Sequence, residues 1–397
     1  MIKRLLICAV VLISMVGCSK KEEKNAPEGQ NGSVFISAEY CRECHKAIYS
    51  EWKSSMHAKS APMSDKVFAK LFNMSGNDTV IGRRNGKPLV CINCHVPTAA
   101  LDDEVDLTKE PIYSEGVTCT FCHKIKSIKD EKGRALGAKA YEFNSGEIYS
   151  ASLVDAKSDA HETSFNPLFS KSEFCSGCHE KRMNENGLNL CTTYEEFKLS
   201  GKAKSMSCQD CHMPEREGRV ASSSDVEKKM HFHGSTGGHD IDRVRSVIGL
   251  DIELNKESNS FSVIAQNKNA AHKLPTSLPL RQIILKVIQF DERGSIVKEN
   301  FRNTPMEDKN ALFIVAFKDG NGNIMMSSKD AESIAFDNRI NPHGDRVIIY
   351  DLASGNVAKI RAELYYRLVP EVFAKNGDID EYAKESHLIA IKEINVK

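Results

Sequence analysis

The sequence predicts an α+β protein with two parts: a mostly helical or irregular region over residues 34–245 and an antiparallel β-sandwich of the immunoglobulin-like type over residues 246–397. Two observations predict this division. Five copies of a C-x-x-C-H motif lie in the first part, and no cysteine follows them. Runs of β-branched residues separated by turn signals fill the second part. A chain of 397 residues is long enough for two separate cores.

Residues 1–17 have the features of an export signal. Lys3 and Arg4 form a basic start, and the apolar stretch that follows is shorter than the ~20 residues needed to cross a bilayer. The stretch ends in SMVGC, which resembles the lipobox of bacterial lipoproteins, so we expect Cys18 to be lipidated. A plain signal peptide or an uncleaved anchor is the alternative.

Residues 18–33 are charged and then rich in Gly, Asn and Pro, which indicates a flexible tether. Ser19, directly after the lipid site, is typical of sorting to the outer membrane. We therefore expect an exported outer-membrane lipoprotein that faces the periplasm or the cell surface and contacts the membrane through its lipid anchor. Lys+Arg and Asp+Glu are equal at 54 each, which argues against a nucleic-acid partner.

The C-x-x-C-H motif is the attachment sequence of c-type haem. Two thiols add to the two vinyl groups, and the next histidine ligates the iron from the proximal side. The copies are Cys41-Arg-Glu-Cys44-His45, Cys91-Ile-Asn-Cys94-His95, Cys119-Thr-Phe-Cys122-His123, Cys175-Ser-Gly-Cys178-His179 and Cys208-Gln-Asp-Cys211-His212. Five covalently bound haem c groups are therefore predicted, and residues 34–245 are predicted to be a pentahaem cytochrome c domain with the cofactors as most of its core.

Zinc binding and thioredoxin-like redox chemistry are the competing explanations of paired cysteines. Zinc sites combine C-x-x-C pairs without requiring a histidine after each second cysteine, and redox motifs occur singly within a βαβ pattern. Histidine makes up 13 of 397 residues, so its presence after every pair is improbable by chance. Cys8 lies in the signal, and Cys191 is left as an odd thiol that we expect to be buried and inert.

A second histidine, His57, follows the first motif. Ile48, Trp52 and Met56 form one apolar stripe of a helix between His45 and His57. On such a helix the two histidines are ~18 Å apart, whereas two nitrogens on one iron lie within ~4 Å. We therefore expect His57 to reach the iron of a different haem.

The first motif with Trp52, Ser55 and His57 resembles the first motif of the cytochrome c-552/4 (c-554-like) multihaem family. GVTCTFCHKI, SEFCSGCHE and TYEEFKLSGKAKSMSCQDCHMP resemble its later motifs, so the resemblance covers about residues 35–240. It implies that His57 is a distal axial ligand and that the protein passes electrons between partner proteins. Phe197 replaces the family's usual tryptophan, and the type member has four haems.

The resemblance implies further distal ligands among the histidines outside the motifs. His161, fourteen residues before Cys175, lies where the family often has one. In MHFHGSTGGHD, His231 is preferred over His233, and His233 over His239. A metal-binding or solvated histidine cluster is the alternative for this segment.

His272 lies in NAAHKLPTS, which resembles an H-x-x-P-T element of such proteins. It is equally consistent with a distal ligand and with a structural histidine at the end of a strand. His343 is expected in a turn and His387 in a terminal amphipathic stretch, neither of them as a ligand.

The second part of the chain reads as antiparallel strands. The candidate strands are SVIGLDIEL, SFSVIAQ, RQIILKVIQF, ALFIVAF, RVIIYDL and AKIRAELYYRLV, with a short helix at 379–387 before a final strand. Ile360, Ala362, Leu364 and Tyr366 alternate with polar residues, which predicts a half-buried strand. We expect a module that packs on the haem region or docks a partner.

The favoured function is electron relay by a lipid-anchored pentahaem cytochrome between periplasmic or outer-membrane redox partners, such as other cytochromes and terminal reductases. The alternative is an oxidoreductase that reduces a small nitrogen or oxyanion substrate at one open-coordinate haem. No C-x-x-C-K motif occurs, and the spare histidines exceed the demand, which favours a carrier over an enzyme. A structural subunit of a cytochrome conduit is a third interpretation, and the oligomeric state stays open.

Overall fold

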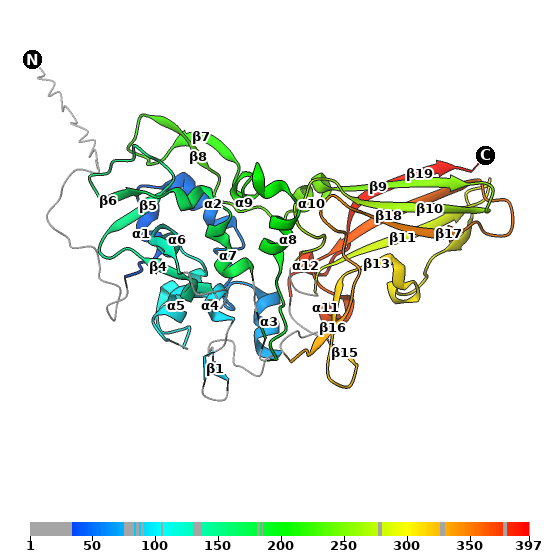
Figure 1. The fold of residues 1–397 in the computed structure, drawn as a ribbon, viewed down its shortest axis with the longest axis horizontal. Coiled ribbons are helices and arrows are strands. Elements are labelled where there is room, and N and C mark those ends of the chain that lie inside the picture. The colour runs from blue at the N-terminus through cyan, green and yellow to red at the C-terminus, as the bar shows by residue number, and fades with distance from the viewer. Residues whose placement is uncertain are drawn as a thin grey trace, which may run out of the picture.

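The structure is a computed structural model that describes residues 34–74, 83–84, 87–88, 91–104, 106–129, 137–180, 183–184, 186–276, 280–325, 330–375 and 379–396. The predicted signal peptide, the lipid site Cys18 and the tether lie outside the described residues. Short helices gather at one end of an elongated molecule and long strands at the other (Figure 1), so the α+β class is confirmed. Among the described residues, no helix combines the length and apolarity that crossing a membrane requires.

The N-terminal half contains short helices, and no α-helix of the described residues exceeds nine residues. They are α1 (Ala38–Arg42), α2 (Lys46–Ser54), α3 (Lys66–Met74), α4 (Ile92–His95), α5 (Pro97–Leu101), α6 (Cys119–His123), α7 (Glu173–His179), α8 (Thr193–Leu199), α9 (Cys208–His212) and α10 (Ile241–Val247). The 3-10 turns are η2 (Pro111–Glu115), η3 (Gly137–Ala140), η4 (Pro167–Ser170) and η5 (Lys202–Lys204). Helices this short are not stable alone, so packing must hold them.

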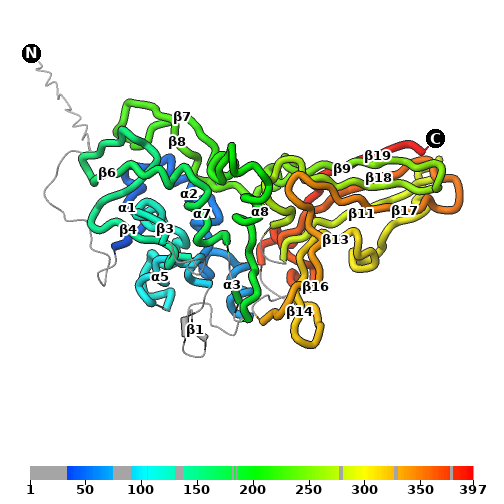
Figure 2. The backbone as a smooth tube through the Cα atoms, viewed as in Figure 1, coloured from blue at the N-terminus to red at the C-terminus, as the bar shows by residue number. Residues whose placement is uncertain are grey.

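Two-stranded sheets lie between these helices. In Figure 2 the backbone tube of this half follows long irregular connections. The antiparallel pairs are β1 (Arg83–Arg84) with β2 (Lys87–Pro88), β3 (Ile125–Ile128) with β4 (Tyr141–Phe143), and β7 (Glu215–Arg219) with β8 (Glu227–His231). One pair is parallel: β5 (Ile148–Ala151) with β6 (Glu162–Phe165). The predicted mixture of short helices and irregular connections is therefore observed.

The helix predicted between His45 and His57 is shorter than expected. It ends at Ser54, because Ser55 is extended (ψ 160°) and its amide donates to the carbonyl of Trp52. The hydroxyl of Ser55 then accepts from the amide of Ala58, which folds the next residues into a turn. His57 lies in this turn, after the helix rather than on it.

Two antiparallel sheets form most of the C-terminal half. One has the order β17 (Asp345–Asp351), β10 (Ser260–Asn267), β9 (Ile248–Asn255). The other has the order β12 (Ile296–Glu299), β11 (Gln282–Phe290), β18 (Lys359–Arg367), β19 (His387–Asn395), with β13 (Leu312–Phe313) also on β11. A smaller sheet contains β15 (Ile324–Met325), β14 (Val315–Lys318) and β16 (Ser333–Asp337), and the remaining elements are η6 (Pro305–Glu307), η7 (Lys309–Ala311), α11 (Glu371–Lys375) and α12 (Glu381–Lys384).

The two larger sheets bury one common apolar core. Phe261 and Val263 of β10 face into it from one sheet, and Ile360 and Leu364 of β18 from the other, all fully buried. The alternation predicted for β18 is confirmed, because its residues are buried at every second position. Burial of this kind is the main stabilising contribution to a sheet pair.

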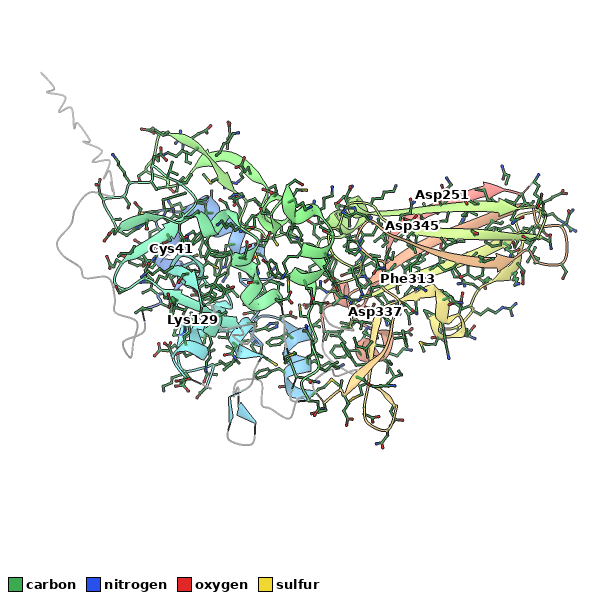
Figure 3. All side chains as sticks on the ribbon, in the orientation of Figure 1. Cys41, Lys129, Asp251, Phe313, Asp337 and Asp345 are labelled. Carbon is green, nitrogen blue, oxygen red and sulfur yellow. The ribbon has the colours of Figure 1, made fainter. Side chains whose placement is uncertain are left out.

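The helical half docks on this core through α3. Val67 and Leu71 pack against the core cluster of the sheets, and the ammonium of Lys70 lies 4.3 Å from the ring centre of Phe373. Asp337, at the end of β16, lies where the sheets approach the helical half (Figure 3). The division into two domains at residue 245 stays a prediction, and the packing of α3 links the two halves.

Candidate haem centre

Each C-x-x-C-H motif forms one turn of helix. We number the five sites 1 to 5 in chain order, from Cys41, Cys44 and His45 to Cys208, Cys211 and His212. At site 1 the amide of His45 donates to the carbonyl of Cys41 at 2.9 Å. At site 5 the helix begins at a capping box between Ser207 and Asp210, which fixes the start of the motif.

Four pairs of histidine rings face one another, and the distance between ring centroids is nearly the same in each pair. The pairs, with centroid distances, are His45–His161 (6.2 Å), His57–His179 (6.4 Å), His123–His233 (6.2 Å) and His212–His272 (6.2 Å). Two iron–nitrogen bonds of about 2 Å, with about 1 Å from each nitrogen to its ring centre, separate two axial imidazoles by roughly 6 Å. The spacing therefore fits an iron between each pair, and each pair joins a motif histidine to one from elsewhere.

Backbone carbonyls orient most of these rings. The Nδ1 atoms of the motif histidines lie 2.7 Å from Val220 O at His45, 2.8 Å from Ser150 O at His123, and 2.6 Å from Thr236 O at His212. Their partners do the same, at His161 with Glu162 O (3.2 Å), His233 with His231 O (2.7 Å) and His272 with Lys273 O (3.0 Å). An Nδ1–H that donates to a carbonyl leaves Nε2 for a metal.

His57 is held by the segment before site 3. Its carbonyl accepts from the amide of Val117 at 2.9 Å, and the indole of Trp52 donates to the carbonyl of Val117 at 2.8 Å. Gly116 is required between them, because its φ is +67° and a Cβ would lie 2.4 Å from the carbonyl oxygen of His57. As expected from the sequence, His57 faces the histidine of a different site, His179.

Site 2 is built differently. The His95 ring stacks on the ring of Phe68 at 3.9 Å with an interplanar angle of 9°. Its Nδ1 lies 3.2 Å from the carbonyl of Ser60, whose hydroxyl donates to the carbonyl of His95 at 2.7 Å. Phe68 projects from α3, the helix that docks on the sheets, so the orientation of this histidine depends on that junction.

The other histidines lie apart from the facing pairs. His231, preferred from the sequence over His233, has its Nδ1 2.6 Å from Met213 O, and it is His233 that faces His123. The carbonyl of His239 accepts from the hydroxyl of Tyr382. His343 has a positive φ of 50° in a turn, and His387 begins β19.

Thiols of different motifs lie side by side. Three pairs are within hydrogen-bonding reach: Cys41–Cys119, Cys94–Cys178 and Cys175–Cys208. The pKa of the Cys175 thiol is raised by Cys208, by burial and also by Cys122. Because Cys122 belongs to site 3 and Cys175 to site 4, these two sites lie close together. The motifs therefore adjoin in the order 1, 3, 4, with sites 2 and 5 both beside site 4.

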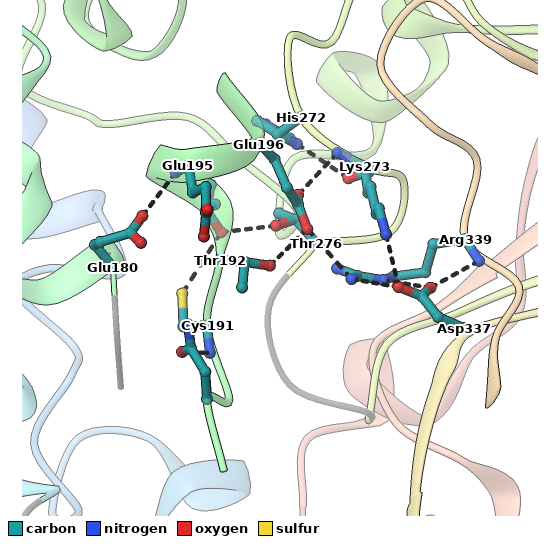
Figure 4. Close-up of polar contacts among 12 residues, drawn as sticks. Glu180, Cys191, Thr192, Glu195, Glu196, His272, Lys273, Thr276, Asp337 and Arg339 are labelled. Carbon is teal, nitrogen blue, oxygen red and sulfur yellow. Dashed lines mark hydrogen bonds and ion pairs between the residues drawn. The ribbon is translucent and has the colours of Figure 1, made fainter. Parts of the chain in front are cut away.

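A buried ion network fixes the loop that carries His272 (Figure 4). The carboxylate of Glu196 on α8 lies 3.2 Å from Arg339 and accepts from the amide of Lys273 at 3.0 Å. Asp337 pairs with both Arg339 and Lys273 at 2.8 Å. Burial disfavours the charged form of Asp337, but hydrogen bonds from Arg339 and Lys273 outweigh it and lower its pKa to about 2.

Sequence reasoning did not find this network. Asp337 and Arg339 lie in no motif, and Glu196, which lies in the TYEEF segment, is more than 140 residues away from both of them in the chain. The only signal in the sequence was Lys273, a charged residue directly after the candidate ligand His272. Cys191 is half-buried, with its sulfur 3.6 Å from the hydroxyl of Thr193.

Comparisons with known proteins identify a matching family model and a similar solved structure. Residues 40–124 match the family model described as "Cytochrome c554 and c-prime". The fold is similar to the crystal structure of a penta-heme cytochrome c552 from Thermochromatium tepidum, with 30% identity, a TM-score of 0.78, and coverage of 91% of this chain and 99% of that chain. No curated protein matches the chain.

Proposed function

The chain belongs to the multihaem c-type cytochromes, electron-transfer proteins with covalently bound haem c, and on that premise we propose that it carries five haems and relays electrons between exported redox partners. The observation that carries the proposal is the set of four facing histidine pairs at 6.2–6.4 Å. A haem with a histidine on each side has both axial positions filled, so it exchanges electrons without binding substrate.

The proposed ligand sets follow from the pairs. The cysteines of each motif hold the porphyrin and the next histidine is proximal. The distal ligands are His161 at site 1, His233 at site 3, His57 at site 4 and His272 at site 5. When bound, each haem supplies a one-electron store, and two histidines without methionine favour a low potential.

Burial favours the neutral form of six of these imidazoles, the form that binds a metal. It is the main cause that lowers the pKa of His179 and of His233 to about 4. Burial also lowers the pKa of His57, His123, His212 and His272. These ligands are therefore ready to bind iron throughout the neutral pH range.

We propose that electrons pass along sites 1, 3 and 4 and leave site 4 toward site 2 or site 5. The adjoining thiols of Cys41 and Cys119, and of Cys175 and Cys208, support this order. Site 4 is the branch point, because its second cysteine, Cys178, also adjoins Cys94 of site 2. Neighbouring porphyrins at such attachment points would exchange single electrons.

For the C-terminal half we propose an immunoglobulin-like sandwich that completes site 5. Named in chain order, β9, β10 and β17 correspond to strands A, B and E, and β11, β18 and β19 to C, F and G. This is the division of strands between the sheets of that fold. The loop after β10 would provide the distal ligand His272.

We also propose that a lipid on Cys18 anchors the whole protein to the outer membrane.

Electron counting tests the relay. The fully reduced protein, mixed anaerobically with an oxidised soluble cytochrome, should transfer five electron equivalents and then stop. With excess dithionite as the electron donor, steady reduction of nitrite or hydroxylamine by the protein, faster than with dithionite alone and continuing beyond five electron equivalents, would instead establish the enzymatic alternative.

The enzymatic alternative would need one haem whose distal position is open to a small nitrogen or oxyanion substrate. Carbon monoxide added to the dithionite-reduced protein should then bind at one haem in five, and His57→Ala should add a second binding haem.

A further inference from the structure

A partly buried cation, Arg281, lies where the helical half meets β18. Arg281 directly precedes β11, and Tyr366 of β18 is opposite Ile283 in the register of the two strands. The hydroxyl of Tyr366 is buried with the rest of its side chain, which is 2% exposed. Arg281 is within hydrogen-bonding reach of this hydroxyl.

A glycine lets these two groups converge. A Cβ at Gly238 would lie 2.5 Å from Nη1 of Arg281 and 2.6 Å from the hydroxyl oxygen of Tyr366. Any larger residue would displace the guanidinium, the hydroxyl or both. The chain at position 238 therefore forms one wall of the space in which Arg281 and Tyr366 meet.

His239 follows that glycine and brings a third donor to the same place. Its backbone is fixed by the hydroxyl of Tyr382, which donates to the carbonyl of His239 at 2.7 Å. Burial, with the charges of Arg281 and Lys59, lowers the pKa of His239 to about 3. The imidazole is therefore neutral and has an N–H available for donation.

The cluster has excess positive charge. Within the described ranges, Arg281 makes no ion pair with a carboxylate. Burial raises the pKa of the nearby Asp65, and the positive charge of Arg281 offsets only part of this increase. A partly buried guanidinium without a counter-ion is costly, and a planar carboxylate or oxyanion is the partner it binds best.

We propose that Arg281, Tyr366 and His239 form a binding site for a carboxylate or small oxyanion beside haem site 4. The charge of Arg281 also reaches His179, the motif histidine of that site. The proposal rests on the proposed haem at site 4. Two sources share this chemistry: a propionate of that haem, or a diffusible oxyanion such as nitrite.

Redox potentials and anion titrations separate the two sources. Wild type, Arg281→Gln and Tyr366→Phe are compared by potentiometric titration and by calorimetry with nitrite and with phosphate. Arg293→Gln, on the exposed turn after β11, is the matched control for loss of one positive charge. Tyr366→Phe removes only a hydroxyl, so it carries the test if Arg281→Gln does not fold.

If a propionate occupies the site, Arg281→Gln lowers the midpoint potential of one haem, because a positive charge that stabilised the reduced haem is lost. Tyr366→Phe then gives a smaller shift in the same direction, and added anions change nothing. If a diffusible oxyanion occupies it, wild type binds nitrite or phosphate saturably, and either variant weakens this roughly tenfold or more.

The proposal is overturned if Arg281→Gln and Tyr366→Phe both match Arg293→Gln in potentials and anion binding. The haem content of each variant, measured by intact mass, keeps this result distinct from a failure of the proposed function. Unchanged potentials with five haems attached reject only the anion site. A wild type without haem at site 4 rejects the relay itself.

Discussion

At the scale of single residues, most of the imidazoles expected to bind iron have a backbone carbonyl beside Nδ1. His212 and His272 illustrate this, because their Nδ1 atoms lie 2.6 and 3.0 Å from Thr236 O and Lys273 O. A carbonyl fixes the ring and its tautomer without adding a charge. The loss of one such ring should therefore affect one haem and leave the others unchanged.

His57→Ala should convert one haem from low-spin to high-spin while every haem stays attached. The reason is that His57 faces His179 at 6.4 Å, whereas the thioethers of site 4 depend only on Cys175 and Cys178. Electron paramagnetic resonance of the oxidised protein, with intact mass for haem content, measures both effects. His343→Ala, in an exposed turn, is the control and should leave the spectrum unchanged. A His57→Ala spectrum identical to wild type would remove His57 from the ligand set.

Asp337 should make stability depend on pH in the acid range. Its pKa is lowered to about 2 in the folded protein and is about 4 when unfolded. A depressed folded pKa contributes stability that is complete above pH 4 and is lost as the pH falls toward 2. Thermal unfolding measured from pH 5 to pH 2 should show this loss in wild type, and Asp337→Asn should flatten the curve. Parallel curves for the two proteins would contradict the assignment.

At the scale of elements, the loop after β10 joins the sheets to the haem region. His272 lies on this loop, and Glu196 of α8 holds the neighbouring amide of Lys273. The side chains of Glu196 and Arg339 are each only 8% exposed, so their ion pair is largely removed from water. Removing one charge leaves the other buried without its partner, which is more costly than losing a surface pair.

Glu196→Gln should lower the free energy of unfolding by about 3 kcal/mol and broaden the low-spin signal of one haem, because the loop that carries His272 loses its anchor. Chemical unfolding and electron paramagnetic resonance are the measurements. Glu195→Gln, on the exposed side of the same helix, is the matched control. Equal stability of the two variants would show that the network does not hold the loop.

Elements with a strong local pattern could be predicted from the sequence. The alternation of apolar and polar residues around Ile360 and Leu364 predicted strand β18, and the predicted final strand corresponds to β19. The helix before His57 ended early because Ser55 accepts a hydrogen bond from Ala58, a local competition that apolar periodicity does not report. The helix α11 was missed because its five residues pack on α3 and the sheets rather than repeating a pattern.

The covalent part of the candidate site could be predicted completely as motifs, whereas the distal histidines could be predicted only as a set. His231 and His233 are two residues apart, and only the packing of the segment after β8 decides which of them faces His123. The network of Glu196 and Arg339 could not be predicted, since tertiary contact alone brings such distant residues together. The anion-binding cluster at Arg281 was hidden for the same reason.

At the scale of the whole molecule, the order of the five sites makes the haem region one connected unit. Site 4 adjoins sites 2, 3 and 5 through its cysteines, so it is the centre of the proposed path. The sheets contribute at the edge of this unit, through His272 at site 5 and through the packing of α3 near site 2. All of this depends on porphyrins being fastened to the chain at each motif.

Intact mass spectrometry of the exported protein, after acid–acetone extraction of any loosely bound haem, tests that dependence most directly. The expected result is the mass of the polypeptide plus five haem groups, with the red colour retained by the protein. A mass equal to that of the bare polypeptide, with the colour in the acetone, would contradict covalent attachment and the electron relay built on it.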